Sequence, residues 1–247
     1  MSISLTGKYN TAKVFTDNID SETISQVITL LNQEFTKDLQ IRIMPDCHAG
    51  KGCVVGTTMT LKDKVIPNTV GVDIGCGMLA VKLEESEIDL KLLDEVINTK
   101  VPSGFSIHDR AVTKFDKLNH IRCDINIDNA NRSIGSLGGG NHFIEVDKDK
   151  DGALWLVIHC GSRHLGIEVC NYYQKAGYKA IKHEDLDTKI KYTIKNLKDK
   201  GLQREIENTV KILKMQAPNI PEHLAYVEGQ LFKDYIYDMK ITQEYAK

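Results

Sequence analysis

The segment Gly71-Val-Asp-Ile-Gly-Cys-Gly77 constrains the fold more than any other stretch of the sequence. Its three glycines permit backbone turns with positive φ and close approach of neighbouring chain, which other residues rarely allow. Such turns can bring the carboxylate of Asp73 and the thiol of Cys76 to one point, where both could bind a divalent ion. The alternative is a small buried cysteine in a tight turn, so the segment alone leaves both interpretations open.

Length and composition narrow the class of protein. A chain of 247 residues, 41% of them apolar, can bury a substantial core in one large or two small domains. Its formal charge of −2 excludes a general basic surface for nucleic acid, so any site for a polyanion must be local. The sequence contains no apolar run of membrane-spanning length and no signal-peptide pattern at its start, which predicts a cytoplasmic protein with no membrane partner and with free thiols.

Hydrophobic periodicity predicts a mixed α/β (α+β) chain with glycine-rich loops at strand ends and a helical C-terminal section. Fourteen of the 18 glycines lie between residues 50 and 166, and the helical pattern begins after them. We therefore interpret 1–247 as a single domain with two parts, an α/β metal-binding part over 1–166 and a helical part over 167–247. The expected elements are a helix over 20–35 capped by Asp20, strands over 41–44, 53–59, 78–83, 142–146 and 154–158, helices over 90–97 and near 109–119, and helices from 168 onward, the last opened by Pro221.

Four side chains with metal-binding chemistry stand at the edges of predicted strands in glycine-rich loops: Asp73, Cys76, His142 and His159. Each has an ordinary alternative, since a lone histidine on a strand is usually a packed core residue. Their joint occurrence favours a metal site over independent explanations. A carboxylate, a thiolate and imidazoles suit Mn²⁺ or Zn²⁺, and one cysteine thiolate can be shared by two ions.

Other polar residues flank these four. Asn141 follows the glycines of 138–140, whose amides could bind an anion or could simply form a flexible connection. Arg163 has a planar guanidinium group whose paired N–H donors suit phosphate, although surface arginines on turns commonly bind no ligand. Asp46 and His48 could be metal ligands, groups that orient the ligands, or a turn-capping pair.

Four segments together resemble the RtcB family of RNA-splicing ligases. They are Pro45-Asp-Cys-His-Ala-Gly-Lys-Gly52, Val70-Gly-Val-Asp-Ile-Gly-Cys-Gly-Met78, Ser136-Leu-Gly-Gly-Gly-Asn-His-Phe-Ile-Glu145 and His159-Cys-Gly-Ser-Arg163. They occur in the family's order, and the resemblance covers nearly the whole chain. It implies an RtcB-like fold.

The resemblance also implies an activity and roles for single residues. Such enzymes use GTP and Mn²⁺ to form a histidine–guanylate, then join RNA ends bearing a 2′,3′-cyclic phosphate or 3′-phosphate to a 5′-hydroxyl, in tRNA splicing and RNA repair. An archease-type activator is a further implied partner. By motif, Asp73, Cys76, His142 and His159 would be ligands of two metal ions with Cys76 bridging, Asn141 would contact the guanylate phosphate, Glu145 the guanine, and Arg163 phosphate or RNA, with Asp46 and His48 behind the ligands.

The resemblance covers only part of the family's length. The family's further histidine ligand and its guanylylated histidine have no counterpart in this sequence, so we expect a C-terminally truncated chain that is inactive in isolation. The alternatives are a metal-dependent hydrolase that opens cyclic phosphates and a non-catalytic metal-binding fragment. Smaller departures from the family pattern are Cys47, Cys160 and His164.

Overall fold

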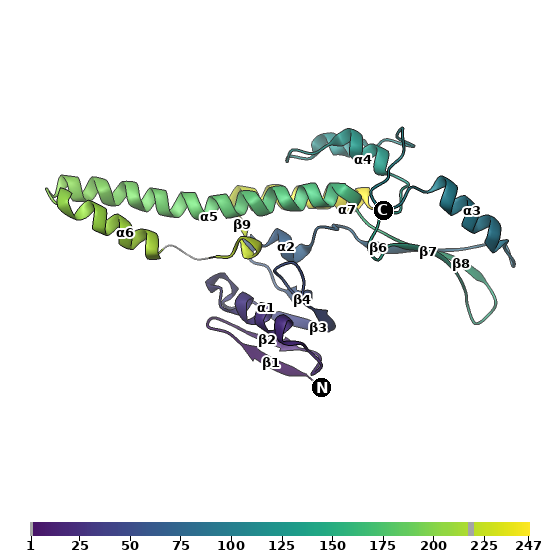
Figure 1. Cartoon of the computed structure of the whole chain (residues 1–247), viewed down its shortest axis with the longest axis horizontal. Coiled ribbons are helices and arrows are strands. Elements are labelled where there is room, and N and C mark those ends of the chain that lie inside the picture. The colour runs from purple at the N-terminus through teal and green to yellow at the C-terminus, as the bar shows by residue number, and fades with distance from the viewer. Residues whose placement is uncertain (1, 217–219) are drawn as a thin grey trace. The chain divides into compact units, whose positions relative to one another are not determined.

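A computed structural model describes residues 2–216 and 220–247, apart from the side chains at 183–185, 187 and 214–216 (Figure 1). The chain is a mixture of helices and strands, which confirms the predicted fold class. It divides into two compact units that are interleaved in sequence. Unit 1 contains Met1–Val70 and Asn171–Lys233, and unit 2 contains Gly71–Cys170 and Asp234–Lys247.

Unit 1 is built on a four-stranded sheet with the order β1-β2-β3-β4, in which only the β2–β3 pair is parallel. A second, two-stranded sheet pairs β5 with β9. The elements that begin in this unit are β1 (Ile3–Thr6), β2 (Thr11–Val14), α1 (Ser21–Leu31), η1 (Glu34–Thr36), β3 (Ile41–His48), β4 (Val55–Met59), β5 (Lys64–Val65), α2 (Pro67–Val70), η3 (Gln203–Glu205), α6 (Ile206–Gln216), η4 (Glu222–Leu224), β9 (Val227–Glu228) and α7 (Gly229–Tyr245).

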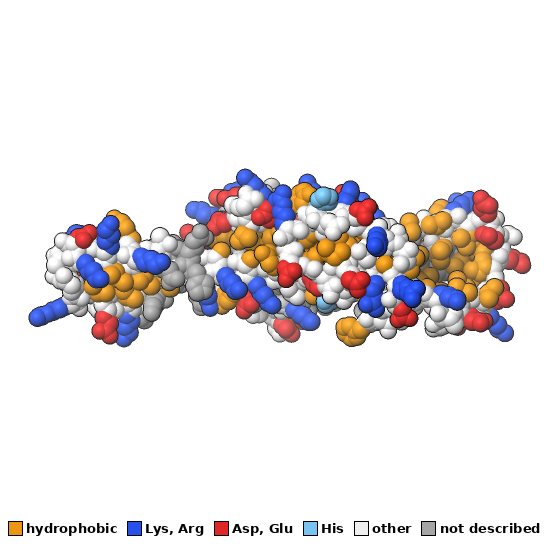
Figure 2. All heavy atoms as spheres, turned by 90° about the horizontal axis from the view of Figure 1, so that it is seen from above, with side chains coloured by type: hydrophobic (Ala, Val, Ile, Leu, Met, Phe, Trp, Pro, Cys, Tyr) orange, Lys and Arg blue, Asp and Glu red, His pale blue; other side chains and the backbone are white. Residues whose placement is uncertain are grey.

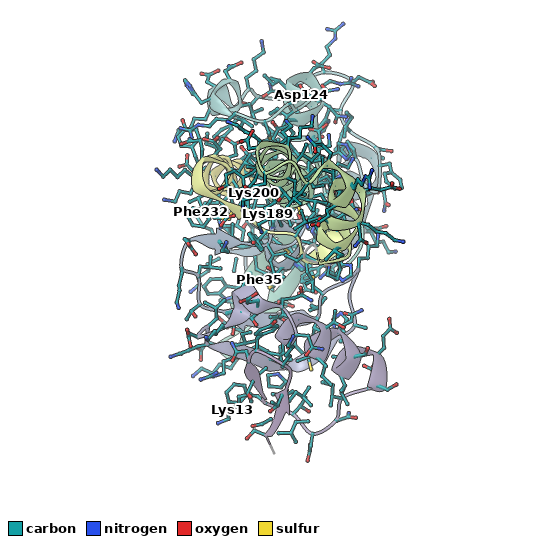
Figure 3. The ribbon with its side chains drawn as sticks, turned by 90° about the vertical axis from the view of Figure 1, so that its left-hand side faces the viewer. Lys13, Phe35, Asp124, Lys189, Lys200 and Phe232 are labelled. Carbon is teal, nitrogen blue, oxygen red and sulfur yellow. The ribbon has the colours of Figure 1, made fainter. Side chains whose placement is uncertain are left out.

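The predicted first helix packs its apolar face on this sheet (Figure 1). Asp20 caps it as expected, since its side chain accepts a hydrogen bond from the Thr23 N–H at 2.9 Å. Val27 and Leu31 are buried against Ile41 and neighbouring strand residues. The helix ends at Leu31 rather than Phe35, and the short 3₁₀ turn that follows places Phe35, labelled in Figure 3, edge-on to Tyr226 with ring centroids 5.1 Å apart.

Strand β3 is longer than predicted, because it continues through Pro45 to His48. The pairing with β4 shifts register between Ile43 and His48. Proline has no N–H to donate to a ladder, so the irregularity accommodates it. Asp46 and His48 therefore lie within a strand, where the Nδ1 atom of His48 is 3.1 Å from the Asp46 carbonyl oxygen.

The prediction that Pro221 opens the last helix is wrong. The segment after Pro221 forms a single 3₁₀ turn, and Val227–Glu228 then pairs with Lys64–Val65 as a strand. This pairing with a distant segment outweighs the local helical pattern, and α7 begins only at Gly229.

Unit 2 is built on a three-stranded antiparallel sheet with the order β6-β8-β7. Its elements are β6 (Gly77–Lys82), α3 (Leu90–Lys100), η2 (Asp116–His120), α4 (Ile127–Ser133), β7 (Phe143–Lys148), β8 (Leu154–Cys160), the start of α5 (Arg163–Asp199) and the C-terminal part of α7. The strands predicted at 78–83, 142–146 and 154–158 are confirmed within one or two residues. Strands β6 and β7 begin directly after the candidate ligands Cys76 and His142, and β8 contains the candidate ligand His159.

The helix predicted near 109–119 is wrong. Only a 3₁₀ turn over Asp116–His120 forms there. The backbone N–H groups before it bond to the next helix instead: that of His108 to the Arg132 carbonyl at 3.1 Å, and that of Phe115 to the Asn131 side chain at 3.0 Å. That helix, α4, starts at an Asn126 cap and was not predicted.

Apolar side chains remain exposed on unit 2. Met78, Leu79 and Val81 of β6 are more than two-fifths exposed, as are Leu90, Leu92 and Val96 of α3. Figure 2 shows hydrophobic side chains gathered at the right-hand end, over the elements α3 and β6–β8. Among the residues that the structure describes, no helix has the length and apolar character to span a bilayer.

Candidate metal centre

The loop between α2 and β6 folds back on itself as its glycines predict. Gly71 and Gly75 have φ values of +97° and +84°, and the Cys76 N–H donates to the Asp73 carbonyl oxygen at 3.0 Å. Gly75 also lies directly against the end of α7, since a Cβ atom there would be 3.1 Å from the Cα of Gln243 and 2.8 Å from the Cβ of Ala246 just after the helix. The turn places the side chains of Asp73 and Cys76 on the same side of the loop, within reach of a common ion.

Two further contacts fix the Asp73 carboxylate. The Ser162 N–H donates to its Oδ1 atom at 3.1 Å. Gly161 leaves the space that the carboxylate fills, because a Cβ atom there would lie 2.2 Å from Oδ1 and 2.4 Å from Oδ2. The segment after β8 therefore positions the Asp73 carboxylate in two ways. Ser162 donates a hydrogen bond to it, and Gly161, which has no side chain, leaves room for it.

The ring of His142 bridges the glycine-rich loop and Asp73. Its Nδ1 atom is 3.0 Å from the Leu137 carbonyl oxygen, and its Nε2 atom is 2.9 Å from Oδ2 of Asp73. A neutral imidazole has one N–H. The Leu137 carbonyl oxygen can only accept a hydrogen bond, so it requires this N–H to be at Nδ1. Nε2 then presents a lone pair to a carboxylate oxygen, so a cation between these two atoms would satisfy both.

His159 completes the cluster from strand β8. Its Nε2 atom lies 3.1 Å from the Sγ atom of Cys76, and its ring is 5.4 Å from that of His142 and 5.3 Å from that of Phe143, both edge-on. The register of the sheet explains this position, since His159 pairs with Met78 on one side and with Phe143 on the other. The central strand thus places the ring at the end of the sheet where Cys76 directly precedes β6.

The ligand atoms of Asp73, Cys76 and His142 all lie within 4.8 Å of one another. Donor atoms bound 2.0 to 2.3 Å from one ion are separated by about 3 to 4.5 Å, so the cluster has suitable dimensions for a metal centre. Desolvation and the nearby Asp73 carboxylate raise the pKa of the Cys76 thiol to about 11. The thiol therefore keeps its proton at neutral pH until a cation displaces it. The structure brings the four expected ligands together, and their binding of a metal stays a prediction.

The other expected residues have different positions. Asn141 and Arg163 line a cavity of about 630 Å³ that Asp73 and His142 also line. Glu145 is exposed on β7, two residues after Phe143 and therefore on the sheet face that His159 shares. Asp46 and His48 belong to unit 1, so their expected role behind the ligands stays a prediction.

The side chain of Arg163 is engaged within unit 2. Its Nε–H donates to Oγ of Ser136 and an Nη2–H to the Gly104 carbonyl oxygen, both at 3.1 Å. The guanidinium lies against Gly138, where a Cβ atom would be 1.4 Å from Nη1. Both acceptors are uncharged, so these bonds leave the positive charge of Arg163 beside the cavity without neutralising it.

Several residues of the site were not predicted. Leu137 acts through its carbonyl oxygen, which no side-chain motif reveals. Gly161 was visible within His159-Cys-Gly-Ser-Arg163, and a glycine between candidate ligands signals close approach, although it does not show what approaches. Phe105 and His164 also line the cavity, and the weakly patterned segment around Phe105 gave no reason to select it.

Comparison with known proteins is consistent with the motifs. A family model described as tRNA-splicing ligase RtcB matches residues 29–123 and 119–247. The RNA-splicing ligase RtcB of Escherichia coli (strain K12) is 33% identical over 175 residues, which cover 60% of this chain and 42% of that protein. The tRNA-splicing ligase RtcB of Methanococcus maripaludis is 29% identical over 196 residues, which cover 56% of this chain and 41% of that protein. The chain thus spans about two-fifths of the length of these relatives.

Proposed function

Because the chain belongs to the RtcB family of tRNA-splicing ligases, we propose that it supplies the metal-binding part of a GTP- and Mn²⁺-dependent RNA ligase. The reaction joins RNA ends bearing a 2′,3′-cyclic phosphate or a 3′-phosphate to 5′-hydroxyl ends. RNA and GTP are then the ligands of the site, and an archease-type activator is a further partner. This proposal fits a chain that spans about two-fifths of the length of its relatives.

One observation supports the proposal most. Asp73, Cys76 and His142 present ligand atoms within 4.8 Å of one another, and His159 touches Cys76. These residues would hold the metal, with the Cys76 thiolate shared between two ions. Bound Mn²⁺ supplies positive charge that stabilises a transferring phosphoryl group and orients it. The same donor set also suits Zn²⁺, so the identity of the ion is part of the test.

Three residues are proposed to bind the substrates. Asn141, exposed two residues before β7 and lining the cavity, would donate its amide N–H to the guanylate phosphate. Glu145 would accept hydrogen bonds from the guanine, whose N–H groups suit a carboxylate. Arg163 would add its positive charge for phosphate or RNA, since the acceptors of its two hydrogen bonds are uncharged.

Metal binding is the first test. Free Mn²⁺ has an electron paramagnetic resonance signal that is lost on binding, so titration of the chain gives the affinity and the number of ions. We expect Cys76→Ala to weaken binding at least about tenfold, because the thiolate is a ligand. Cys47→Ala, in unit 1, is the matched control and should leave binding unchanged. A parent chain that binds neither Mn²⁺ nor Zn²⁺, or a Cys76→Ala variant with parental affinity, would contradict the proposal.

The second test separates the activities. We expect no stable covalent label when the chain alone is incubated with radiolabelled GTP and Mn²⁺, and no joining of RNA ends. Covalent labelling would show that the nucleophile lies in this chain and would overturn its assignment as the metal-binding part. Turnover of a 2′,3′-cyclic phosphate that disappears in Cys76→Ala would identify a hydrolase instead.

A further inference from the structure

We propose that Phe105 is a stacking platform for an unpaired base of the RNA substrate, next to the candidate metal centre. The inference rests on the proposed function and names a contact with the RNA that the family motifs do not assign. Three properties of Phe105 support it: the exposure of its ring, the hydrogen bonds that fix the turn presenting it, and the cavity that it borders, whose lining combines apolar side chains with polar ones and candidate metal ligands.

The ring of Phe105 is completely exposed, with a relative accessibility of 108%. An exposed aromatic ring contributes little to the stability of the fold, and at the edge of a cavity its face is available to a ligand. The neighbouring Gly104 has φ +60° and open space where a Cβ atom would stand. The left-handed backbone at Gly104 therefore lets the chain turn and project the next side chain outward.

The turn that carries Phe105 is fixed by hydrogen bonds. The Gly104 N–H donates to the Gly138 carbonyl oxygen at 2.7 Å, the Ser106 N–H to the Ser103 carbonyl at 3.0 Å, and Arg163 to the Gly104 carbonyl at 3.1 Å. A parallel bridge between Ser103 and Gly138 adds a further link to the glycine-rich loop. The turn that carries Phe105 is thus bonded to the glycine-rich loop that orients His142, and little backbone entropy would be lost when a base stacks on the ring.

The cavity beside Phe105 has the chemistry of a nucleotide site. Its volume is about 630 Å³, and Asp73, Asn141, His142, Arg163 and His164 contribute to its lining. A cation next to an aromatic face is the usual arrangement for single-stranded nucleic acid, since the ring stacks a base while the cation meets the phosphate. The candidate metal ligands Asp73 and His142 lie in the same wall, so a base on Phe105 would place its phosphate toward the metal centre.

An apolar polypeptide is the competing occupant, and the cavity itself argues against it. Unit 2 has a second cavity, of about 610 Å³, whose lining includes Leu79, Ile144 and Ile158, and which better suits an apolar segment. The wall beside Phe105 contains the Arg163 guanidinium, the His164 imidazole and the Asn141 amide, and an apolar segment would bury these polar groups without offering them hydrogen bonds.

Single-stranded RNA binding tests the proposal. A fluorescein-labelled oligonucleotide with a 3′-phosphate is titrated with the chain in the presence of Mn²⁺, and its anisotropy gives the dissociation constant. Loss of one stacked base should weaken binding about tenfold in Phe105→Ala, whereas Phe105→Trp should retain parental affinity. Phe15→Ala removes an exposed aromatic ring from unit 1 and is the matched control, with no change expected.

A scan of abasic nucleotides identifies the stacked base. One abasic position should weaken binding to the parent chain about tenfold and have no further effect in Phe105→Ala, because both changes remove the same contact. Equal affinity of Phe105→Ala and the parent, additive effects at every abasic position, or no RNA binding by the parent would overturn the proposal. So would loss of self-association in Phe105→Ala on sedimentation, which would identify a protein contact. Mn²⁺ binding is measured in parallel, because its failure alone would refute the metal centre rather than the platform.

Discussion

The Nε2 atom of His142 lies 2.9 Å from the Oδ2 atom of Asp73, although 69 residues separate them in the sequence. Besides this contact, each side chain is positioned by a backbone group: His142 by the Leu137 carbonyl oxygen and Asp73 by the Ser162 N–H. The geometry of the candidate metal centre should therefore depend on the glycines that shape these backbone segments. Two of the predictions below test this dependence.

Gly161→Ala should weaken Mn²⁺ binding with little loss of stability. A Cβ atom at this position would lie 2.2 Å from Oδ1 of Asp73, so the carboxylate must move away from His142. We expect a loss of metal affinity of about 10- to 100-fold, as for changes that misplace a ligand. Titration by paramagnetic resonance and thermal unfolding of the metal-free chain measure the two effects separately.

Gly77→Ala is the control for this prediction. Gly77 follows Cys76 directly, but the nearest atom to its added Cβ is the Gly75 carbonyl oxygen at 3.6 Å, an ordinary contact. Both substitutions place alanine beside a candidate ligand, and only one of them displaces a ligand atom. Similar metal affinities in the two variants would show that Asp73 is not held as the structure indicates.

Gly138→Ala should destabilise unit 2 more than Gly140→Ala does. Both glycines have positive φ, +86° and +77°, so alanine costs about 1 to 2 kcal/mol of backbone strain at either position. At Gly138 the added Cβ would also meet the Arg163 guanidinium at 1.4 Å, whereas Gly140 has open space. The displacement of Arg163 should add about 1 to 3 kcal/mol, measured as the difference between the two free energies of unfolding in urea. Equal losses would mean that the loop does not depend on Arg163.

Local patterns in the sequence predicted the elements that short-range physics decides. The α1 cap at Asp20, the β6 and β8 strands and the glycine-rich loop before β7 follow from capping chemistry and periodicity. The errors fall where distant segments decide. The strand at Val227–Glu228 forms because Lys64–Val65 pairs with it, and the segment before Asp116 bonds to α4 instead of to its own preceding turn.

The ligand residues of the candidate metal centre could be predicted from the sequence, but the backbone groups that position them could not. Asp73, Cys76, His142 and His159 were visible because each combines ligand chemistry with a glycine-rich strand end. Backbone groups such as the Leu137 carbonyl and the Ser162 N–H have no sequence signature, since every residue has them. Phe105 could not be predicted for another reason. Its proposed role depends on the exposure of its ring and on a cavity that is formed by segments far apart in the sequence.

Asp238→Ala should destabilise unit 2 strongly. This residue is completely buried on α7, and its carboxylate accepts the N–H groups of Arg122 at 2.9 Å and Cys123 at 3.0 Å. The substitution removes the carboxylate that accepts these two backbone N–H groups, and each lost hydrogen bond should lower the free energy of unfolding by about 1 to 3 kcal/mol. The free energy of unfolding in urea measures the loss.

Asp234→Ala provides the matched control on the same helix. Asp234 forms an ion pair with the side chain of Arg122, which is nearly half exposed, so its removal should cost no more than about 1 kcal/mol. A loss at Asp234 as large as that at Asp238 would show that the partly exposed ion pair contributes as much as the buried carboxylate to joining α7 to the segment before α4.

The turn between β7 and β8 should respond to acid through Asp149. Its carboxylate accepts the indole N–H of Trp155 and the backbone N–H groups of Ala153 and Asp151, each at 2.9 Å. The Trp155 bond, with the backbone bonds behind it, lowers the pKa of Asp149 below its usual value of 3.8. A carboxyl group whose pKa is lower in the folded state stabilises that state above its unfolded pKa, and this contribution is lost as the pH falls through the folded value.

We therefore expect Asp149→Asn to be less stable than the parent at about pH 5, with the difference shrinking as the pH falls to about 3. Trp155 is the only tryptophan in the chain, so its fluorescence during urea unfolding reports on this hairpin directly. Asp151→Asn is the control, because Asp151 contributes its backbone N–H to the turn, which the substitution keeps. A stability difference between parent and Asp149→Asn that stays constant across this range would show that the carboxylate charge does not hold the turn.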